Sequence, residues 1–327
     1  MIEVLATSAL ATVQDFGRDG ALRWGVGSAG AMDPLALAAG NILLGNADDA
    51  AAIEVPVFPL RVRFVEGCAF AITGVDVDAR LDERPVLPWT ALRARAGQQL
   101  LLSLPRRDAT WPASRAYLCL AGGVDVPVVL GSRSTQLRGT FGGLDGRPLC
   151  AGDVLRSGAA TSKKFIEGLG LVPPALAMPL QRDGLPALRV LPAAEYAAYT
   201  EASRAAFWAE PWKITAQSDR YGYRLEGRPL EAFAPIEMRS HGIVPGVIQV
   251  PPGGQPIVQM RDAQPSGGYP KLGTVIEADL WRLGQAPVGS RVRFVECDWD
   301  AAVAALEETQ RWLSEARRWV SLQRAAA

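Results

Sequence analysis

The hexapeptide Arg61-Val62-Arg63-Phe64-Val65-Glu66 occurs twice in this chain, and residues 291–296 repeat it letter for letter. Both copies belong to short runs rich in Val, Leu, Ile and Phe. A related pattern, in which a glycine is followed by two residues and then an apolar strand, recurs at Gly97, Gly152 and Gly289. Such self-similarity indicates two related β-units within one polypeptide.

The remainder of the chain has the same rhythm. Its 33 glycines and 24 prolines are spread evenly and separate many short apolar runs, which is typical of a β-rich protein with tight turns. The clearest predicted strands lie within residues 60–73, 99–104, 115–120, 247–250 and 291–296. We therefore predict a mainly β fold with a few helices.

Three helices are expected. The best marked covers residues 34–44, because Asp33 followed by a proline is an N-terminal cap and Gly45 is a typical C-terminal stop. This helix is apolar on most faces and should be buried. A second is predicted over residues 193–209, and a third over residues 300–323, where apolar residues recur with helical spacing.

These elements predict the domain organisation. Residues 1–160 form a first β-unit and residues 186–300 a second, and residues 301–327 contain a C-terminal helix that packs across one of them. Residues 161–185 are the expected linker, since periodicity is weak there and prolines gather near its end. A chain of 327 residues is long enough for about two domains.

Composition excludes several classes of protein. The 34 Lys and Arg residues balance the 34 Asp and Glu residues, so nucleic acid and an anionic membrane are unexpected partners. We find no signal-peptide pattern and no apolar run that could span a bilayer, and we expect a cytoplasmic protein. The four cysteines form no Cys-x-x-Cys pair and His241 is the one histidine, which excludes a zinc ribbon and multi-histidine metal sites.

Standard catalytic motifs are missing or out of context. Residues 25–30 match Gly-x-Gly-x-x-Gly, but charged residues rather than an apolar strand precede them, and the next helix opens only at Pro34. These glycines therefore indicate tight turns or a close backbone approach. The sequence contains no phosphate-binding Gly-Lys loop, no His-Glu-x-x-His motif and no Gly-x-Ser-x-Gly elbow.

Polar side chains gather instead in four glycine-containing loops, at residues 12–18, 131–135, 218–224 and 262–270. Loops of this kind often carry binding groups on a rigid β scaffold. The alternative is turn chemistry with surface ion pairs, and the sequence leaves both open. His241 lies in a further such segment, Arg239-Ser240-His241-Gly242, and its imidazole suits proton transfer at neutral pH.

In this order, these clusters resemble the family of 5-oxoprolinase C subunits, also known as allophanate hydrolase subunit 2 or biotin-dependent carboxyltransferase. The resemblance covers residues 1 to about 300. The matching stretches are residues 12–15, 30–33, 41–46, 117–127, 131–135, 142–147, 218–220, 222–227, 240–242, 245–251 and 254–258. One departure is that Pro265 and Ser266 stand where the family usually has two threonines.

The resemblance implies two cyclophilin-like β-barrel units. It also implies partners, because the B and C subunits of 5-oxoprolinase activate 5-oxoproline with ATP and its A subunit then completes the hydrolysis to glutamate. ATP and Mg²⁺ are then expected at the level of the complex. Relatives in the family leave two alternatives open, a urea- or allophanate-type carboxyltransferase component and a Kip-type regulatory binding protein without catalysis.

Phosphorylating the oxygen of a lactam turns it into a leaving group, and such a site needs cations for phosphates and donors for the oxygen. We therefore expect His241, Arg220 and Asp262 to be catalytic, with the metal ligands left open. Other residues of the family loops are expected to bind substrate or nucleotide. They are Gln14, Asp15, Arg18, Ser132, Ser134, Thr135, Asp219, Gln249, Gly267, Gly268, Tyr269 and Lys271.

Overall fold

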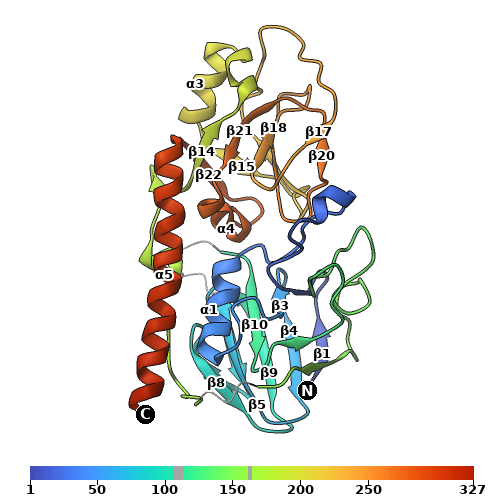
Figure 1. Ribbon diagram of the computed structural model, residues 1–327, viewed down its shortest axis with the longest axis vertical. Coiled ribbons are helices and arrows are strands. Elements are labelled where there is room, and N and C mark those ends of the chain that lie inside the picture. Colours follow the sequence, from blue (N-terminus) through green and yellow to red (C-terminus); the bar gives the residue numbers. More distant parts are fainter. Residues whose placement is uncertain (106–112, 161–163) are drawn as a thin grey trace. The chain divides into compact units, whose positions relative to one another are not determined.

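The computed structural model describes residues 1–105, 113–160 and 164–327 (Figure 1). They divide into two compact units. The first comprises Met1–Arg18, Ala29–Ala177 and Arg311–Ala327, and the second comprises Asp19–Ser28 and Met178–Gln310. The fold is mainly β, as predicted, and each unit has its own sheets.

The second unit contains a closed barrel of seven strands. Its strands follow the order β14, β21, β18, β19, β16, β15 and β22, and β22 pairs back onto β14 in parallel. The bounds are β14 (Leu185–Pro192), β15 (Trp212–Ile214), β16 (Gly222–Glu226), β18 (Val247–Gln249), β19 (Ile257–Gln259), β21 (Lys271–Val275) and β22 (Arg291–Glu296). The short strand β13 (Gln181–Arg182) extends β14 as a hairpin, and β17 (His241–Gly242) pairs with β20 (Ser266–Gly267) as a separate ribbon.

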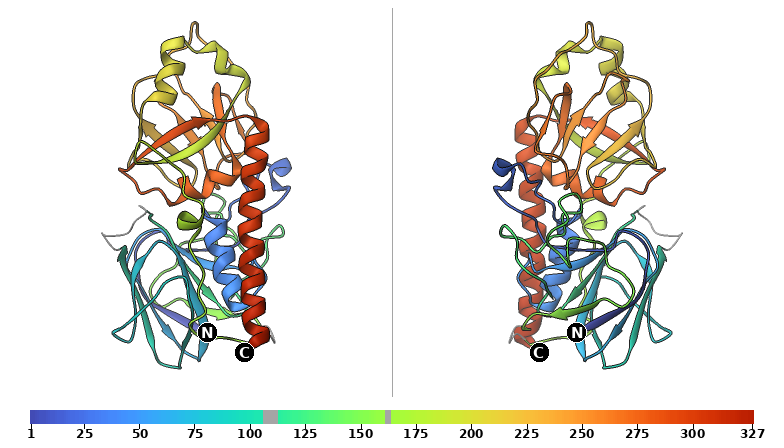
Figure 2. Two further views of the ribbon diagram at one scale, coloured as in Figure 1. Left: turned by 90° about the vertical axis from the view of Figure 1, so that its left-hand side faces the viewer. Right: turned by 90° about the vertical axis from the view of Figure 1, so that its right-hand side faces the viewer.

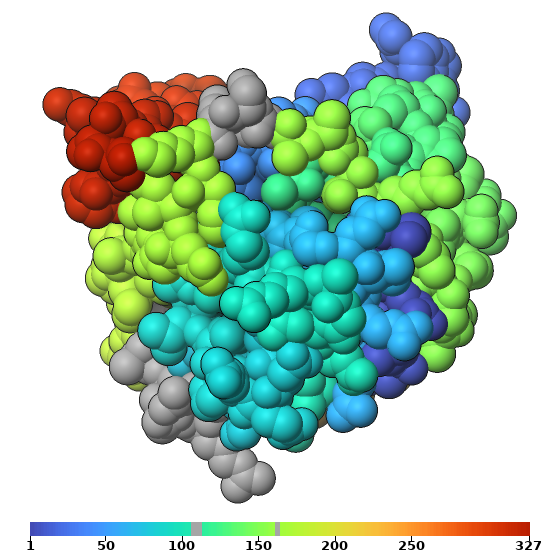
Figure 3. Space-filling view, turned by 90° about the horizontal axis from the view of Figure 1, so that it is seen from below, coloured from blue at the N-terminus to red at the C-terminus, as the bar shows by residue number. Residues whose placement is uncertain are grey.

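The first unit is built from two antiparallel sheets. One has the order β11-β12-β1-β4-β9-β6-β7 and the other β2-β3-β10-β5-β8. The bounds are β1 (Ile2–Thr7), β2 (Thr12–Gln14), β3 (Ala52–Val55), β4 (Leu60–Phe64), β5 (Cys68–Gly74), β6 (Val77–Leu81), β7 (Arg84–Val86), β8 (Ala91–Ala94), β9 (Gln99–Pro105), β10 (Ala116–Leu120), β11 (Val124–Asp125) and β12 (Val154–Ser157). Seen from below in Figure 3, the region of β6 to β9 (cyan) occupies the centre of the visible surface of this unit.

Burial explains why some strands of the first unit alternate and others are apolar throughout. In β4, Val62 and Phe64 enter the core between the two sheets while Arg61 and Arg63 are exposed. Every residue of β10 is buried, because this strand lies at the centre of the five-stranded sheet and both its faces are covered. Its even-numbered residues join the core between the sheets, whereas Tyr117 and Cys119 pack under helices.

Those helices are α1 (Pro34–Leu44) and the second half of α5 (Trp299–Ala326), which lie side by side over the five-stranded sheet (Figure 2). α1 begins and ends as predicted, since Asp33 accepts from the Ala36 amide at 2.9 Å and Gly45 adopts a left-handed conformation. From α5, Ala316 and Val320 enter the same apolar cluster as α1. The Arg317 side chain pairs with Asp48 just after α1. Within residues 1–105, 113–160 and 164–327, every helix is too short or too polar to span a bilayer.

The repeated hexapeptide forms a strand in each unit with the same face buried. Phe64 packs against Phe70 with ring centroids 5.0 Å apart, and Phe294 stacks on Phe207 at 4.7 Å. The neighbours of the two copies differ, because β4 lies between two antiparallel partners and β22 has one parallel and one antiparallel partner. The repeat therefore specifies a half-buried strand, and the rest of each unit decides its pairing.

The glycines two residues before these strands share one turn. Gly97 precedes β9, Gly152 precedes β12 and Gly289 precedes β22. All three have φ near +90°, and each donates its amide to a strand carbonyl at 2.7–2.8 Å. A Cβ at any of them would meet nothing within 4 Å. Glycine is therefore required there by the backbone conformation and not by lack of space.

The helix expected over residues 193–209 is two elements instead. A 3₁₀ helix (Ala194–Ala198) precedes α3 (Glu201–Ala209), and Tyr199 between them is extended and buried. It forms a bridge with Ala232, and Thr200 then caps α3 by accepting from the Ser203 amide at 3.2 Å. The remaining helices are a 3₁₀ turn (Ala21–Trp24), α2 (Pro174–Ala177) and α4 (Glu277–Gln285), none of which the sequence pattern predicted.

The division into units differs from the expected ranges at residues 19–28 and in the expected linker. Residues 19–28 belong to the second unit and Arg311–Ala327 to the first. Much of the expected linker is structured, since Gly168 and Leu171 pair with backbone groups of Ala91 and Trp89 in the first unit. Residues 161–163, at its start, lie outside the described residues.

Candidate functional site

Asp15 is the centre of a buried polar cluster in the first unit, and the two predicted loops of this unit meet there. Its carboxylate accepts hydrogen bonds from the hydroxyls of Ser132 and Ser134 and from the amides of Gly17 and Arg133. Ser134 also accepts from the Asp15 amide at 2.9 Å. Both carboxylate oxygens are thus engaged by the protein itself.

The other predicted residues of the first unit surround this cluster. Arg18 is almost fully buried, donates to the carbonyls of Val129 and Ser134, and lies over the Phe141 ring. Thr135 donates to a carbonyl of β2, and Gln14 donates back to the Thr135 carbonyl at 3.3 Å. These contacts connect the 131–135 loop to residues 13–18. They are the contacts expected if the polar residues of these loops stabilise turns.

In the second unit, Arg220 and Asp262 form a buried bidentate pair. The guanidinium Nε and Nη2 lie 3.0 and 2.9 Å from the two carboxylate oxygens, and the Asp262 amide donates to the Arg220 carbonyl at 2.8 Å. The two residues therefore continue the ladder between β16 and β19 beyond the strands. Both oxygens of Asp262 already accept from Arg220.

Two further predicted residues have local partners. Asp219 accepts from the amides of Tyr221 and Gly222, which forms the turn into β16. Lys271 lies 4.0 Å from the Glu195 carboxylate, and its side chain is mostly buried. A phosphate or carboxylate ligand would have to compete with these contacts.

The side chain of Gln249 lies beside the ribbon of β17 and β20. His241 is paired with Gly267, and a Cβ on Gly267 would lie 2.6 Å from Nε2 of Gln249. A Cβ at this position would have to displace the end of the Gln249 side chain. Gln249 donates to the Tyr269 carbonyl at 3.3 Å and accepts from Gln259 at 3.0 Å.

The imidazole of His241 is held in one tautomer. Its Nδ1 lies 3.0 Å from the carbonyl oxygen of Arg239, and a carbonyl can only accept, so Nδ1 carries the hydrogen. In the neutral ring Nε2 then has a free lone pair. This atom is shielded from solvent and has no hydrogen-bond partner among the residues that the structure describes. Of the predicted site residues, His241 is thus the one whose reactive atom is poised as a proton acceptor.

Pro265 and Ser266, which replace the usual threonines, act through their backbone. The Pro265 carbonyl accepts from the Ile243 amide at 3.0 Å, and Ser266 is paired with Gly242. The loop is therefore held to the histidine segment without either hydroxyl, and the Ser266 side chain is exposed.

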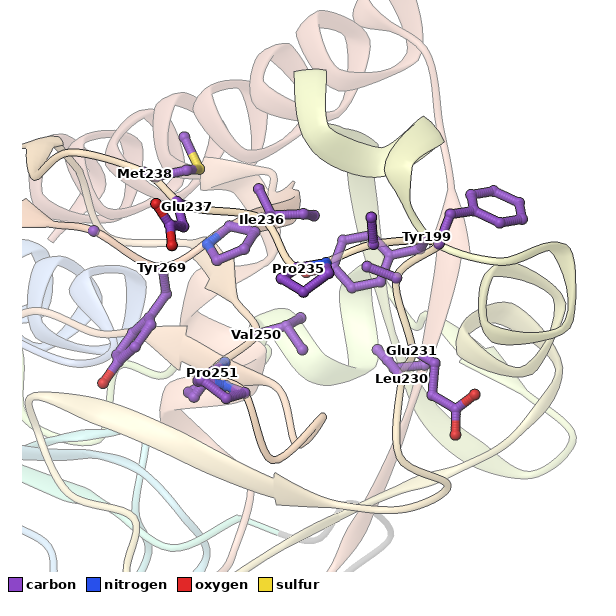
Figure 4. A pocket seen from close by; sticks show the side chains of 16 residues that line it. Tyr199, Leu230, Glu231, Pro235, Ile236, Glu237, Met238, Val250, Pro251 and Tyr269 are labelled. Atoms are coloured by element: carbon purple, nitrogen blue, oxygen red, sulfur yellow. The ribbon is translucent and has the colours of Figure 1, made fainter.

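A pocket of about 860 Å³ opens beside this ribbon, wholly within the second unit (Figure 4). One wall is the segment from Phe233 to Met238, and the other is made by residues 250–252 and 268–270. Gly268 and Tyr269 belong both to this wall and to the predicted site. Sequence reasoning missed the segment before Arg239, the run Ala-Pro-Ile-Glu-Met at residues 234–238, in which Ile236 and Met238 are half-buried.

Sequence reasoning also missed a buried carboxylate in the first unit. Glu54 accepts from the Tyr117 hydroxyl at 2.7 Å and from the Met32 amide at 2.8 Å, and Arg115 lies 3.7 Å away. Burial together with this negative charge raises the pKa of Tyr117 well above its ordinary value. The signal was available, because Glu54 is the one charged residue of an otherwise apolar strand, β3. Its role is to anchor the start of α1, since Tyr117 also accepts from the Asp33 amide.

The described residues do not form a ready-made metal site. They contain no group of three or more His, Cys, Asp or Glu side chains that could hold an ion. Mg²⁺ bound together with nucleotide phosphates needs only one or two carboxylates, but Asp262 and Asp15 both have their oxygens engaged by internal donors. These residues do not fit a metal in the conformation seen.

Comparisons with known proteins agree with one another. Residues 24–296 match the family model described as carboxyltransferase domain, subdomain A and B. The chain is 40% identical to the 5-oxoprolinase C subunit of Escherichia coli (strain K12), over 96% of this chain and 97% of that protein. It is 41% identical to the 5-oxoprolinase C subunit of Haemophilus influenzae, over 98% and 99%.

Among solved structures, the urea amidolyase of K. lactis resembles this chain with a TM-score of 0.87 and 27% identity. The match covers 96% of this chain but spans only 20% of that protein. The likeness therefore concerns one part of a much longer polypeptide.

Proposed function

Because this chain belongs to the family of 5-oxoprolinase C subunits, which are carboxyltransferase-domain proteins, we propose that it is a component of an ATP-dependent 5-oxoprolinase. It works in the cytoplasm with the A and B subunits of that enzyme, and together they activate 5-oxo-L-proline and hydrolyse it to L-glutamate. The chain alone is inactive, and ATP and Mg²⁺ act at the level of the complex.

The observation that carries this proposal is sequence identity over nearly the whole length of this chain and of each relative. Two bacterial C subunits match this chain from end to end at 40–41% identity. The urea amidolyase match is more distant and covers a fifth of that protein. A carboxyltransferase role is therefore the weaker alternative.

In the proposed chemistry, His241 moves a proton. A base that removes the N–H proton of the lactam makes the lactam oxygen a better nucleophile toward the phosphoryl group that ATP supplies. The unprotonated Nε2 of His241 is suited to accept that proton. Gln249, which is buried beside Gly267, can donate to a substrate oxygen if Tyr269 moves.

The test is reconstitution of the purified chain with the A and B subunits, ATP and Mg²⁺, with glutamate release from 5-oxo-L-proline as the readout. We expect turnover only when all three proteins are present. His241→Ala should lower kcat by about 10²–10⁴-fold. Arg239→Ala is the matched control, because it keeps the backbone carbonyl that orients the imidazole.

Glutamate formation by the A and B subunits without this chain would refute the proposed role. Carboxyl transfer from a biotinylated partner, with no glutamate formed, would establish the carboxyltransferase alternative instead.

A further inference from the structure

The pocket beside the β17–β20 ribbon has a composition that does not suit the proposed substrate. Most of its lining is apolar, including Ile236, Met238, Val250 and several prolines. The charged residues among its lining are Glu231 and Glu237, both acidic. A carboxylate such as 5-oxoproline, or a nucleotide phosphate, would meet repulsion there and no cation to bind it. The occupant should be apolar with a positive charge.

One wall of this pocket resembles an unpaired edge strand. Ile236 and Met238 are half-buried, whereas Glu237 and Arg239 between and after them are exposed. This alternation has the period of a β-strand. Within the described part of the chain, the amides of residues 236–240 donate no hydrogen bond. A segment whose backbone amides are unpaired is a template for another extended chain.

Two large aromatic side chains that line the pocket are exposed to solvent. Phe233 is 68% exposed and Tyr269 is 47% exposed, and both belong to its lining. Figure 4 shows Ile236, Val250 and Pro251 around the opening between these two walls. Exposed aromatic residues beside a groove are typical of protein–protein contacts.

We propose that this groove binds an extended segment of a partner protein within the same enzyme complex. The segment pairs with the backbone of residues 236–240, places apolar side chains against Met238 and Val250, and directs a Lys or Arg toward Glu237. The inference rests on the proposed function, since that function supplies the partner. It assigns the groove to assembly and leaves the His241 side of the ribbon to chemistry.

The experiment measures binding of the purified chain to each of the other two proteins of the complex separately, by calorimetry, together with hydrogen–deuterium exchange of the chain alone and in complex. We expect Met238→Asp to weaken binding of one of these proteins at least tenfold, about the effect of losing a central apolar contact. The control is Val244→Asp, an exposed apolar residue of the same unit outside the groove, which should bind normally. Amides 236–240 should exchange more slowly in the complex.

Several results would overturn the proposal. Normal affinity of Met238→Asp with no protection of residues 236–240 would place the interface elsewhere. Loss of 5-oxoproline or ATP binding by Met238→Asp in the chain alone would make the groove a small-molecule site. Self-association of the chain that Met238→Asp abolishes would make the occupant a second copy.

The same measurements separate this proposal from the proposed function. A complex that protects residues 236–240 but forms no glutamate would refute the 5-oxoprolinase role and retain the docking groove. A complex that forms glutamate at the normal rate with Met238→Asp and shows no protection would refute the groove alone.

Discussion

Replacing Asp15 by alanine decides whether the polar cluster of the first unit is a binding site or a structural joint. The carboxylate accepts four hydrogen bonds, two from amides and two from serine hydroxyls. Ser132 and Ser134 are almost fully buried and can rotate toward other acceptors only in part. The amides of Gly17 and Arg133 are fixed by the backbone and lose their partner outright.

The magnitude follows from these donors. A buried donor left without a partner costs about 1–3 kcal/mol, and the values are not additive. Because two amides are only partly buried and water can reach them, we expect Asp15→Ala to lower the free energy of unfolding of the first unit by about 3 kcal/mol. For a domain of this size that corresponds to a fall in Tm of roughly 6–12 °C. Asp15→Asn keeps one carbonyl oxygen and should lose about 1 kcal/mol.

The assay is urea denaturation followed by far-UV circular dichroism, with Asp49→Ala, an exposed acid in the same unit, as the control. The two units can unfold separately, and only the transition of the first should move. The control should stay within about 0.5 kcal/mol of the parent chain. If Asp15→Ala unfolds like the parent chain while the reconstituted complex loses activity, Asp15 is a binding group and the structural reasoning is refuted.

Three other predictions follow from local contacts. Gly97→Ala should cost about 1–2 kcal/mol from its positive φ alone, whereas Gly253→Ala, which has equal space and no positive φ, should be nearly neutral in thermal denaturation. The pKa of Asp153 is lowered chiefly by its bidentate partner Arg147, so the pair stabilises the folded chain by at most about 1 kcal/mol near neutral pH, and this stabilisation falls as the pH drops below about 4. Asp153→Asn should therefore lower the free energy of unfolding at pH 7 and not at pH 2. Equal losses at the two pH values would contradict this. Among the thiols, Cys150 is exposed and should react with a chromogenic disulfide in the native protein, whereas Cys119, whose burial raises its pKa to about 12, should react only after unfolding.

The sequence alone was sufficient for features that depend on neighbouring residues. The cap at Asp33 and the stop at Gly45 fixed α1 from both ends, and the turn glycine at Gly97 was visible because positive φ is a local requirement. The family relationship could also be recognised from the sequence, because the matching motifs are short stretches of residues that occur in the same order along the chain. The single histidine could be named as a candidate, but its tautomer could not.

Tertiary structure decided what depends on residues far apart in the chain. Whether Asp15 faces solvent or four internal donors is set by a loop more than a hundred positions away, at Ser132 and Ser134. The break at Tyr199 within the expected helix follows from a bridge to Ala232, a contact that helix propensity does not contain. The free lone pair of His241 and the unpaired edge beside it likewise arise from packing, because burial and hydrogen-bond partners belong to the folded chain and not to any one residue.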